Sequence, residues 1–291
     1  MALLIDGKIV SENIKNELKK EVNNLLSYSL NPKFAIICVG NNEESLTYVK
    51  NKVKTANSVG INVEVINLSE NTSEEKIIEK IEILNKDKTI HGIIVQMPLP
   101  PHLNEKKITC IIDPKKDIDC FHPYNIGKLV LGDYNFIPAT PLGIIELIKY
   151  YNIETEGKNV TVIGRSNIVG RPISILLSQK NSFGNANVVI LHSRSNNLSF
   201  FTLISDIIIV AVGKPKFLTA DMIKNDSVII DVGINYIDVD GKRKLVGDVD
   251  FENVKNKVKM ITPVPGGVGP MTVVCLLKNL IKAVKLQNNL A

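Results

Sequence analysis

Short apolar runs alternate with longer amphipathic stretches along the chain. The apolar runs are rich in β-branched residues and are bounded by turn residues, which is typical of buried strands. The stretches between them repeat their hydrophobic positions at helical spacing. This alternation predicts an α/β fold with parallel sheets covered by helices on both faces. The predicted strands are 34–40, 63–68, 92–98, 159–164, 187–193, 206–213, 227–234 and 258–264, and the predicted helices include 43–59, 73–86, 141–151 and 270–287.

The strands fall into two series, separated by a segment (111–143) that is rich in turn residues and poor in periodicity. A chain of 291 residues is long enough for two cores. We therefore expect a first domain over 1–140, joined by the C-terminal segment 270–291, and a second domain over 141–269. Within the second domain, YIDVDGKRKLVGDVDF predicts a hairpin that turns on Asp240-Gly241.

Composition and charge exclude several classes of protein. With 44% hydrophobic and 22% charged residues, the chain has the composition of an ordinary globular protein. The net charge is +5, but the lysines are spread along the chain, which argues against a nucleic-acid partner and fits an acidic small molecule. No apolar run approaches the roughly 18 residues that a membrane span requires.

The four cysteines are scattered, with no CxxC pair and no cluster with histidine. We therefore expect no metal site and no disulfide, and a reducing compartment. The N-terminus turns polar after five residues and has no basic leader, so no signal peptide is predicted. These features together predict a cytoplasmic protein.

The segment GKNVTVIGRSNIVGRPISILL predicts a strand, a glycine-containing turn and a helix. Helix N-terminal amides face a pyrophosphate in this arrangement. Gly164 and Gly170 carry the turn, but Ser166 stands where a second glycine is usual, so the strict GxGxxG pattern is absent. From this segment alone, a dinucleotide site and a purely structural connection both remain open.

The end of the next strand discriminates between cofactors. An NAD site usually carries an acidic residue there, which bonds the ribose 2′-hydroxyl. This strand instead ends in Ser193 and Arg194. Together with Arg165, these residues provide the positive charge and hydroxyl that a 2′-phosphate requires, so NADP is favoured over NAD.

The helix predicted over 43–59 carries Lys50, Lys52 and Lys54 on different faces. Lys50 and Lys54 lie opposite the apolar stripe, whereas Lys52 shares an intermediate face with Tyr48 at the edge of the stripe. Lys52 is thus the lysine expected to be partly desolvated and useful in catalysis. The alternative is an ordinary lysine that packs its stem and keeps its amine in water. The stripe consists of Leu46, Val49, Val53 and Ala56.

The turn ITPVPGGVGPMT, 261–272, lies between a predicted strand and a long helix. Proline fixes φ there, and glycine allows a backbone or a ligand to approach closely. The turn itself fits either a tight connection or a wall of a binding site.

Ten segments taken in order resemble the bifunctional methylenetetrahydrofolate dehydrogenase/cyclohydrolase family over essentially the whole chain. They are YVKNK, VQMPLPPH, KDIDCFHP, PATPLG, VIGRSNIVGRP, HSRS, VGKP, DVGIN, GDVDF and TPVPGGVGPMT. The resemblance implies two α/β domains with a cleft between them, the second Rossmann-like and NADP-binding, and a homodimer formed through the second domain. It implies oxidation of 5,10-methylenetetrahydrofolate with NADP and hydrolysis of the methenyl product to 10-formyltetrahydrofolate.

The resemblance also implies roles for individual residues. Lys52 matches the catalytic lysine, Tyr48 the ring that stacks on the folate, and Gln96 the hydrogen-bond partner of the lysine. Asp119 matches the carboxylate that grips the amino-pyrimidine edge of the pterin. The turn at Pro265, Gly266 and Gly267 is expected to be bare so that the substrate can sit against it. The expected cofactor contacts are Gly164, Arg165, Ser166, Ser193 and Ile234, with Arg194 added by the charge argument above.

Two residues depart from the family pattern: Cys120 stands where glycine is usual, and Ala139 where cysteine is common. Neither departure removes a group that the chemistry uses, although Cys120 is expected to narrow the pterin pocket. Two rival functions are a dehydrogenase without cyclohydrolase activity and a non-catalytic nucleotide-binding protein on the same fold. The retained Tyr48, Lys52 and Gln96 argue against the first rival, and Lys52 with Asp119 argues against the second.

Overall fold

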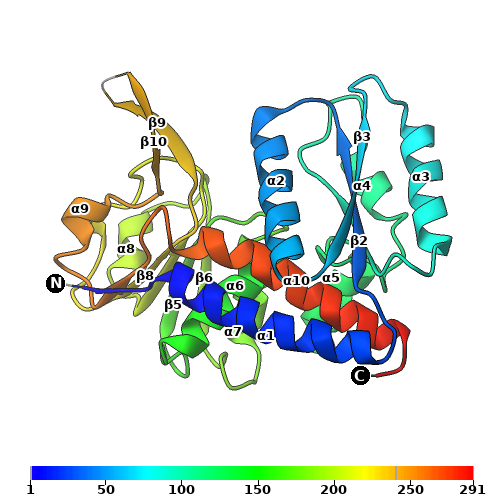
Figure 1. The fold of residues 1–291 in the computed structure, drawn as a ribbon. Helices are drawn as coiled ribbons and strands as arrows, with labels where there is room; N and C mark the ends of the chain where they lie inside the picture. Colours follow the sequence, from blue (N-terminus) through cyan, green and yellow to red (C-terminus); the bar gives the residue numbers. More distant parts are fainter. Residues whose placement is uncertain (1, 240, 291) are drawn as a thin grey trace. The chain divides into compact units, whose positions relative to one another are not determined.

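The computed structural model describes residues 2–239 and 241–290, which form two compact units (Figure 1). One unit contains Thr140–Thr272 and the residues up to Glu12, and the other contains Asn13–Ala139 and the residues from Val273 onward. Helices α1 (Gly7–Ser27) and α10 (Val268–Gln287) contribute to both units. The predicted α/β fold is confirmed. Among the described residues, no helix combines the length and apolarity needed to cross a bilayer.

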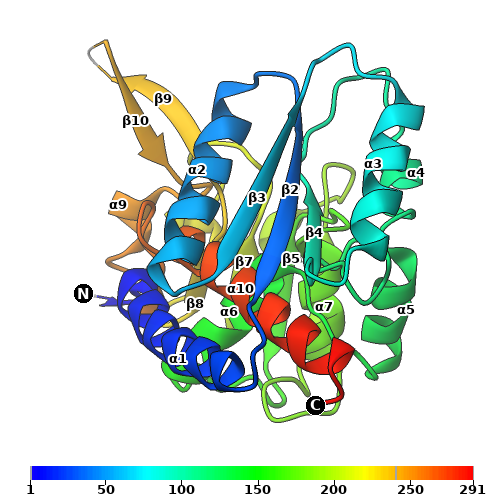
Figure 2. The same cartoon turned by 45° about the vertical axis from the view of Figure 1, so that its right-hand side comes forward.

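The unit that contains Asn13–Ala139 is built on a parallel sheet of three strands, in the order β3-β2-β4. Helices α2 and α3 lie on opposite sides of this sheet (Figure 2). Each of these elements was predicted from its apolar pattern. The bounds are Lys33–Val39 for β2, Glu43–Ser58 for α2, Asn62–Leu68 for β3, Glu74–Lys86 for α3 and Gly92–Val95 for β4.

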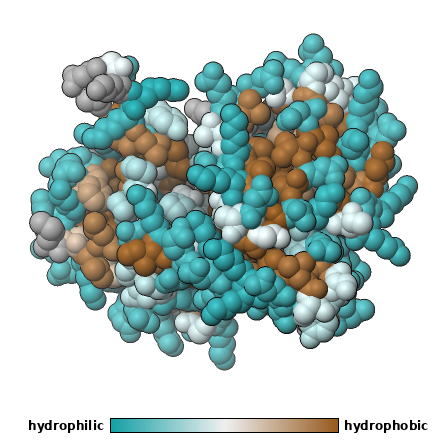
Figure 3. All heavy atoms as spheres, viewed as in Figure 1, coloured by the Kyte–Doolittle hydropathy of each residue, from teal (hydrophilic) through white to brown (hydrophobic). Residues whose placement is uncertain are grey.

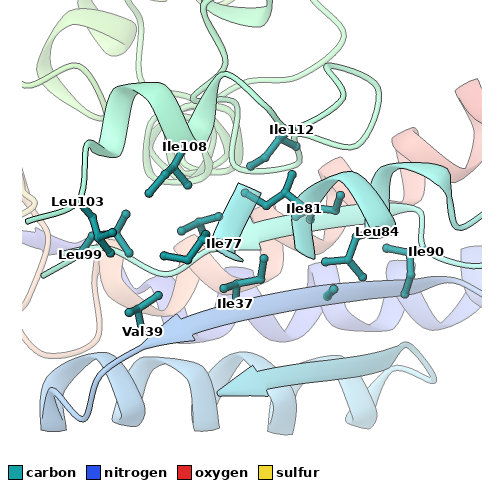
Figure 4. Close-up of a cluster of buried hydrophobic side chains, with 13 residues drawn as sticks. Ile37, Val39, Ile77, Ile81, Leu84, Ile90, Leu99, Leu103, Ile108 and Ile112 are labelled. Carbon is teal, nitrogen blue, oxygen red and sulfur yellow. The ribbon is translucent and has the colours of Figure 1, made fainter. Parts of the chain in front are cut away.

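Strand β2 is the central strand, and this position explains its unbroken apolar run. Alternate side chains point to opposite faces, and both faces are covered, so Phe34 and Ile36 are as fully buried as Ile37. The face with Ile37 packs against buried side chains of α3 (Figure 4). The edge strand β3 is less covered: hydrophobic side chains show between α2 and α3 in Figure 3, and Val65 is 37% exposed.

The other unit holds a six-stranded sheet in the order β1-β11-β8-β7-β5-β6, with every neighbouring pair parallel. The chain runs from β5 outward to β6 and then returns to β7 on the opposite side of β5. The strand order therefore reverses at the carboxyl ends of β5 and β7, which is where open α/β sheets bind ligands. The strands are β1 (Leu3–Leu4), β5 (Asn159–Ile163), β6 (Asn187–Leu191), β7 (Ile207–Val210), β8 (Val228–Asp231) and β11 (Met260–Ile261).

The remaining elements of this unit connect the strands. The predicted hairpin is present as an antiparallel pair, β9 (Asn235–Val239) and β10 (Lys242–Val246), although Asp240 of its predicted turn lies outside the described residues. The helices are α6 (Ala139–Tyr150), α7 (Gly170–Ser178), α8 (Leu198–Thr202) and α9 (Phe251–Val254), with a 3₁₀ turn at Ala220–Met222.

Helix α5 (Pro123–Leu131) was not predicted from the sequence, and it lies in the segment 111–143 that lacks periodicity. Helix α1 and the short α4 (Glu105–Thr109) were not predicted either. Helix α5 nevertheless has local start and stop signals. The His122 side chain caps it by accepting a hydrogen bond from the N–H of Tyr124, and Pro123 occupies its first turn. Gly132 ends it in the left-handed conformation, with a φ of 78°. The helix is too short for its periodicity to stand out from the surrounding turns.

Candidate active site

Lys52 is buried on α2, with 8% of its surface exposed, and its Nζ donates a hydrogen bond of 3.1 Å to Oε1 of Gln96. Gln96 directly follows β4, and its backbone N–H bonds the carbonyl of Ile37 on β2. Its side-chain Nε2 donates to the carbonyl of Met97 at 2.8 Å. Because that carbonyl can only accept, the amide must direct its oxygen toward Lys52. The backbone bond of Gln96 to β2 and the bonds of its side chain together hold the Lys52 amine in one place.

The surface of α2 follows the predicted pattern. Val49 and Ala56 are buried, whereas Lys50 and Lys54 are exposed. Lys52 is buried more completely than expected, which disagrees with the alternative of an amine in open water. Tyr48, one turn earlier on the same face, is 39% exposed and can present its ring to a ligand.

Asp117 organises the loop that carries Asp119. The Asp117 carboxylate is buried and accepts hydrogen bonds from the N–H of Phe121 (3.1 Å), the N–H of His122 (2.9 Å) and Nδ2 of Asn125 (2.7 Å). This loop, 116–123, therefore has a fixed backbone. This role of Asp117 was not predicted from the sequence, although its position one residue before the buried Ile118 in KDID was a signal.

Asp119 lies in this fixed loop and is half-buried. Burial raises the pKa of its carboxyl, while the positive charge of Lys52 acts in the opposite direction. Within the described residues, no donor makes a hydrogen bond to the Asp119 carboxylate. A partly buried carboxylate near a buried amine is thus available to accept from a ligand.

Cys120 adopts a φ of 59°, in the left-handed region that favours glycine. This backbone conformation gives a physical reason for the glycine that is usual at this position. The Cys120 side chain is fully buried, and its Sγ contacts the carbonyl oxygen of Phe136 at 3.4 Å. Ala139, the other departure, is a buried residue at the start of α6.

The turn between β5 and α7 requires glycine at two positions. Gly164 has a φ of 126°, and a Cβ there would lie 2.3 Å from the carbonyl oxygen of Ala211. A Cβ at Gly170 would lie 2.1 Å from the carbonyl oxygen of Gly164. The Ser166 hydroxyl accepts from the N–H groups of Val169 (3.1 Å) and Gly170 (3.4 Å), the residues at which α7 begins.

The other predicted cofactor residues follow strands of the same sheet. Arg165 follows β5, Ser193 and Arg194 follow β6, and Ile234 follows β8; all four are exposed. Because the strands are parallel, their carboxyl ends share one edge of the sheet. This edge offers a glycine turn, a helix N-terminus, two exposed guanidinium groups and no carboxylate at the end of β6, a set that fits a dinucleotide with a 2′-phosphate.

We expect Gly164→Ala to destabilise the fold by at least about 3 kcal/mol, since it adds a clash with the Ala211 carbonyl to the cost of a positive φ. The matched control is Gly157→Ala: Gly157 has a φ of 68°, but nothing lies within 4 Å of a Cβ added there. That control should cost only about 1 kcal/mol. Urea unfolding of both variants measures the difference, and equal costs would remove the close approach from the explanation.

The turn at Pro265, Gly266 and Gly267 contacts residues of the same unit, which contains Thr140–Thr272 and the residues up to Glu12. Gly7 donates its N–H to the carbonyl of Gly266 at 2.8 Å, and a Cβ at Gly7 would lie 1.8 Å from the carbonyl oxygen of Gly267. Gly266 has a φ of 115°, and a Cβ at Gly267 would lie 2.7 Å from that of Thr262. The positive φ of Gly266 and the close approach of Thr262 to Gly267 thus explain the two glycines. Pro265 is exposed.

Two family models match the chain: the catalytic domain of tetrahydrofolate dehydrogenase/cyclohydrolase over residues 5–119, and the NAD(P)-binding domain of the same enzymes over residues 138–288. The chain belongs to the tetrahydrofolate dehydrogenase/cyclohydrolase family. The prediction of this family, and of an enzyme that combines dehydrogenase and cyclohydrolase activities, is confirmed.

Individual relatives agree over their full length. The bifunctional protein FolD of Pelodictyon phaeoclathratiforme is 49% identical, and the match covers 99% of this chain and 100% of that protein. The crystal structure of the bifunctional FolD enzyme of Campylobacter jejuni is 45% identical, with a TM-score of 0.94 over 98% of this chain and 99% of that one. The Trypanosoma brucei FolD structure, a complex with NADP and an inhibitor, is 35% identical, with a TM-score of 0.93 over 98% of both chains.

Proposed function

We propose that the chain oxidises 5,10-methylenetetrahydrofolate with NADP and hydrolyses the 5,10-methenyl product to 10-formyltetrahydrofolate, with Lys52 as the group that handles protons. The buried Lys52–Gln96 pair beside the open carboxylate of Asp119 is the observation that carries this proposal. Tyr48 stacks on the pterin, and Asp119 accepts hydrogen bonds from its amino-pyrimidine edge. The residues at Pro265, Gly266 and Gly267 are a further proposed substrate contact.

Oxidation removes a hydride from the methylene carbon and leaves a methenyl cation on the folate. Bound NADP supplies the hydride acceptor. The residues proposed to hold it are Gly164, Arg165, Ser166, Ser193, Arg194 and Ile234. The contribution of the protein to this step is chiefly placement, because no proton has to be moved.

Hydrolysis adds water to the cationic carbon, which releases a proton, and then breaks one carbon–nitrogen bond, which needs a proton on the leaving nitrogen. A single amine can take the first proton and return the second. Lys52 suits this exchange because Gln96 fixes its Nζ through one hydrogen bond, and no second acceptor bonds this Nζ among the described residues. The two reactions therefore differ in their need for Lys52.

Two separate assays on the purified protein test the proposal. With methylenetetrahydrofolate and NADP, NADPH must form. With methenyltetrahydrofolate and no cofactor, hydrolysis must exceed the spontaneous rate. Failure of the second assay alone would support the rival dehydrogenase without cyclohydrolase activity, and failure of both would support a non-catalytic nucleotide-binding protein.

For the cofactor, we expect a higher kcat/KM with NADP than with NAD, because Arg165 and Arg194 can pair with a 2′-phosphate and no carboxylate follows β6. Arg165→Ala should lower the NADP/NAD ratio about tenfold while changing NAD kinetics little. Arg171→Ala is the matched control, since that guanidinium bonds Oδ1 of Asn167. Equal kcat/KM values for the two cofactors in the unaltered enzyme would contradict the assignment.

The enzyme is further proposed to act as a homodimer in the cytoplasm. Strand β6 ends the sheet order and pairs only with β5 among the described residues, and Val189 and Ile190 on it are 37% and 39% exposed. An edge strand with exposed apolar side chains fits pairing with a second copy. Light scattering should give twice the chain mass of 32.1 kDa. Cys38, Cys110 and Cys120 form no disulfide among the described residues, which fits a reducing compartment.

A further inference from the structure

Asp248 is a fully buried carboxylate in the segment GDVDF, two residues after β10. Its Oδ2 accepts hydrogen bonds from the N–H of Val212 (2.6 Å) and the N–H of Gly213 (3.0 Å). Its Oδ1 accepts from the N–H of Lys214 at 2.8 Å. One side chain thus holds three successive amides of the loop that follows β7. Carboxylate bonds of this kind are stronger than those between neutral groups.

The same carboxylate reaches the segment that follows β8. Its Oδ1 also accepts from Nδ2 of Asn235 at 2.8 Å, and Asn235 directly follows Ile234. A Cβ at Gly233 would lie 2.3 Å from Oδ1 of Asp248, so glycine is what allows the carboxylate to approach this backbone. Asp248 therefore joins the loop after β7 to the segment after β8.

The backbone of Asp248 is itself held by a second buried carboxylate. Oδ1 of Asp231 accepts from the N–H of Asp248 at 2.9 Å, and Oδ2 accepts from the N–H of Val249 at 3.0 Å. Asp231 is the last residue of β8. Asp248 is thus fixed relative to the sheet through its backbone, which Asp231 holds, and through the hydrogen bonds of its side chain.

The loop held by Asp248 lies beside the turn between β5 and α7, which contains Gly164. It begins directly after Ala211, whose carbonyl oxygen is the atom that excludes a Cβ at Gly164. It also leaves the sheet at β7, which with β5 forms the point where the strand order reverses. Displacement of residues 212–214 would therefore disturb the backbone that packs against Gly164 in the proposed cofactor site.

We propose that Asp248 is a positioning residue for the dinucleotide: it bonds no ligand itself but holds the loop Val212–Lys214 and the segment at Ile234 in the form that receives the cofactor. This inference rests on the proposed function of the sheet edge. It predicts that loss of Asp248 acts on cofactor use and spares the reaction that needs no cofactor.

Asp248→Asn tests the inference, because it keeps the shape and replaces one accepting oxygen with an NH2 group that faces N–H donors. We expect the KM for NADP to rise at least about tenfold, with hydrolysis of methenyltetrahydrofolate within about twofold of the unaltered enzyme. Asp250→Asn is the matched control in the same segment: the Asp250 carboxylate bonds only Nδ2 of Asn253 among the described residues. That control should leave the KM for NADP unchanged.

Amide hydrogen exchange without cofactor separates this inference from the proposed function. Asp248→Asn should speed exchange at Val212, Gly213 and Lys214, whichever reaction the enzyme catalyses. If the variant does not fold, Asn235→Ala removes a single donor and should raise the KM for NADP about threefold. Unchanged exchange and KM, or an equal fall of both activities in a folded variant, would overturn the inference. Absence of dehydrogenase activity in the unaltered enzyme would instead overturn the proposed function.

Discussion

Replacing Lys52 with glutamine should abolish hydrolysis of methenyltetrahydrofolate, with a loss of at least about 100-fold, and leave a larger share of the dehydrogenase activity. Glutamine keeps a polar chain of similar length but removes the amine that takes and returns the proton. Hydride removal creates a cation next to Lys52 and transfers no proton, so that step depends more on placement of the reactants. Methenyltetrahydrofolate should therefore accumulate in the variant when it is supplied with the methylene substrate and NADP.

Steady-state rates of the two reactions, measured separately, test this division. Lys50→Gln is the matched control, since Lys50 lies on the same helix but is exposed, and it should change neither rate. Folate affinity is measured in parallel to show that binding is intact. Hydrolysis retained in the Lys52 variant would remove this lysine from the mechanism. An equal loss of both activities with intact binding would refute the division.

Replacing Asp119 with alanine should lower both activities by about 100-fold or more while the fold keeps its stability. Loss of the carboxylate would leave the donors of the pterin edge buried without partners. The folded protein, in contrast, gains little from this group: burial raises its pKa, and no described residue donates a hydrogen bond to the carboxylate. A costly, unpaired carboxylate is expected where a ligand completes the bonding.

Asp117→Ala is the comparison variant, because it should lower the stability of the fold, whereas Asp119→Ala should not. It would remove the acceptor of three hydrogen bonds, from Phe121, His122 and Asn125, and should lower the free energy of unfolding by about 3 kcal/mol. Urea unfolding and both activity assays are run on the two variants. If Asp119→Ala unfolds as easily as Asp117→Ala, or keeps one activity near the normal level, Asp119 is not a pterin ligand.

The elements that could be predicted from the sequence are those whose signal is local. The apolar run of β2 reflects its central place in the sheet, and the apolar stripe of α2 placed Lys52 apart from its neighbouring lysines. Strand β1 escaped prediction because it has only two residues, Leu3 and Leu4, and pairs with β11 some 257 positions away along the chain. A pairing of that kind leaves no pattern in the strand itself.

The residues of the proposed sites also divide into those that local sequence patterns indicate and those that only the fold brings together. Residue types and spacing singled out Lys52 and the turn at Gly164, whereas the pairing of Lys52 with Gln96 came only from the family resemblance. The roles of Asp117 and Asp248 were not predicted. Asp248 bonds backbone amides 34 to 36 residues earlier in the chain, and only the folded sheet brings these groups together.

On the proposed function, one chain carries the folate through both reactions. The most direct measurement follows the products when the purified enzyme is given 5,10-methylenetetrahydrofolate and NADP together. We expect 10-formyltetrahydrofolate to form in step with NADPH and methenyltetrahydrofolate to stay at a low steady level. Methenyltetrahydrofolate that accumulates in equal amount to NADPH, and decays only at its spontaneous rate, would contradict the proposed cyclohydrolase activity.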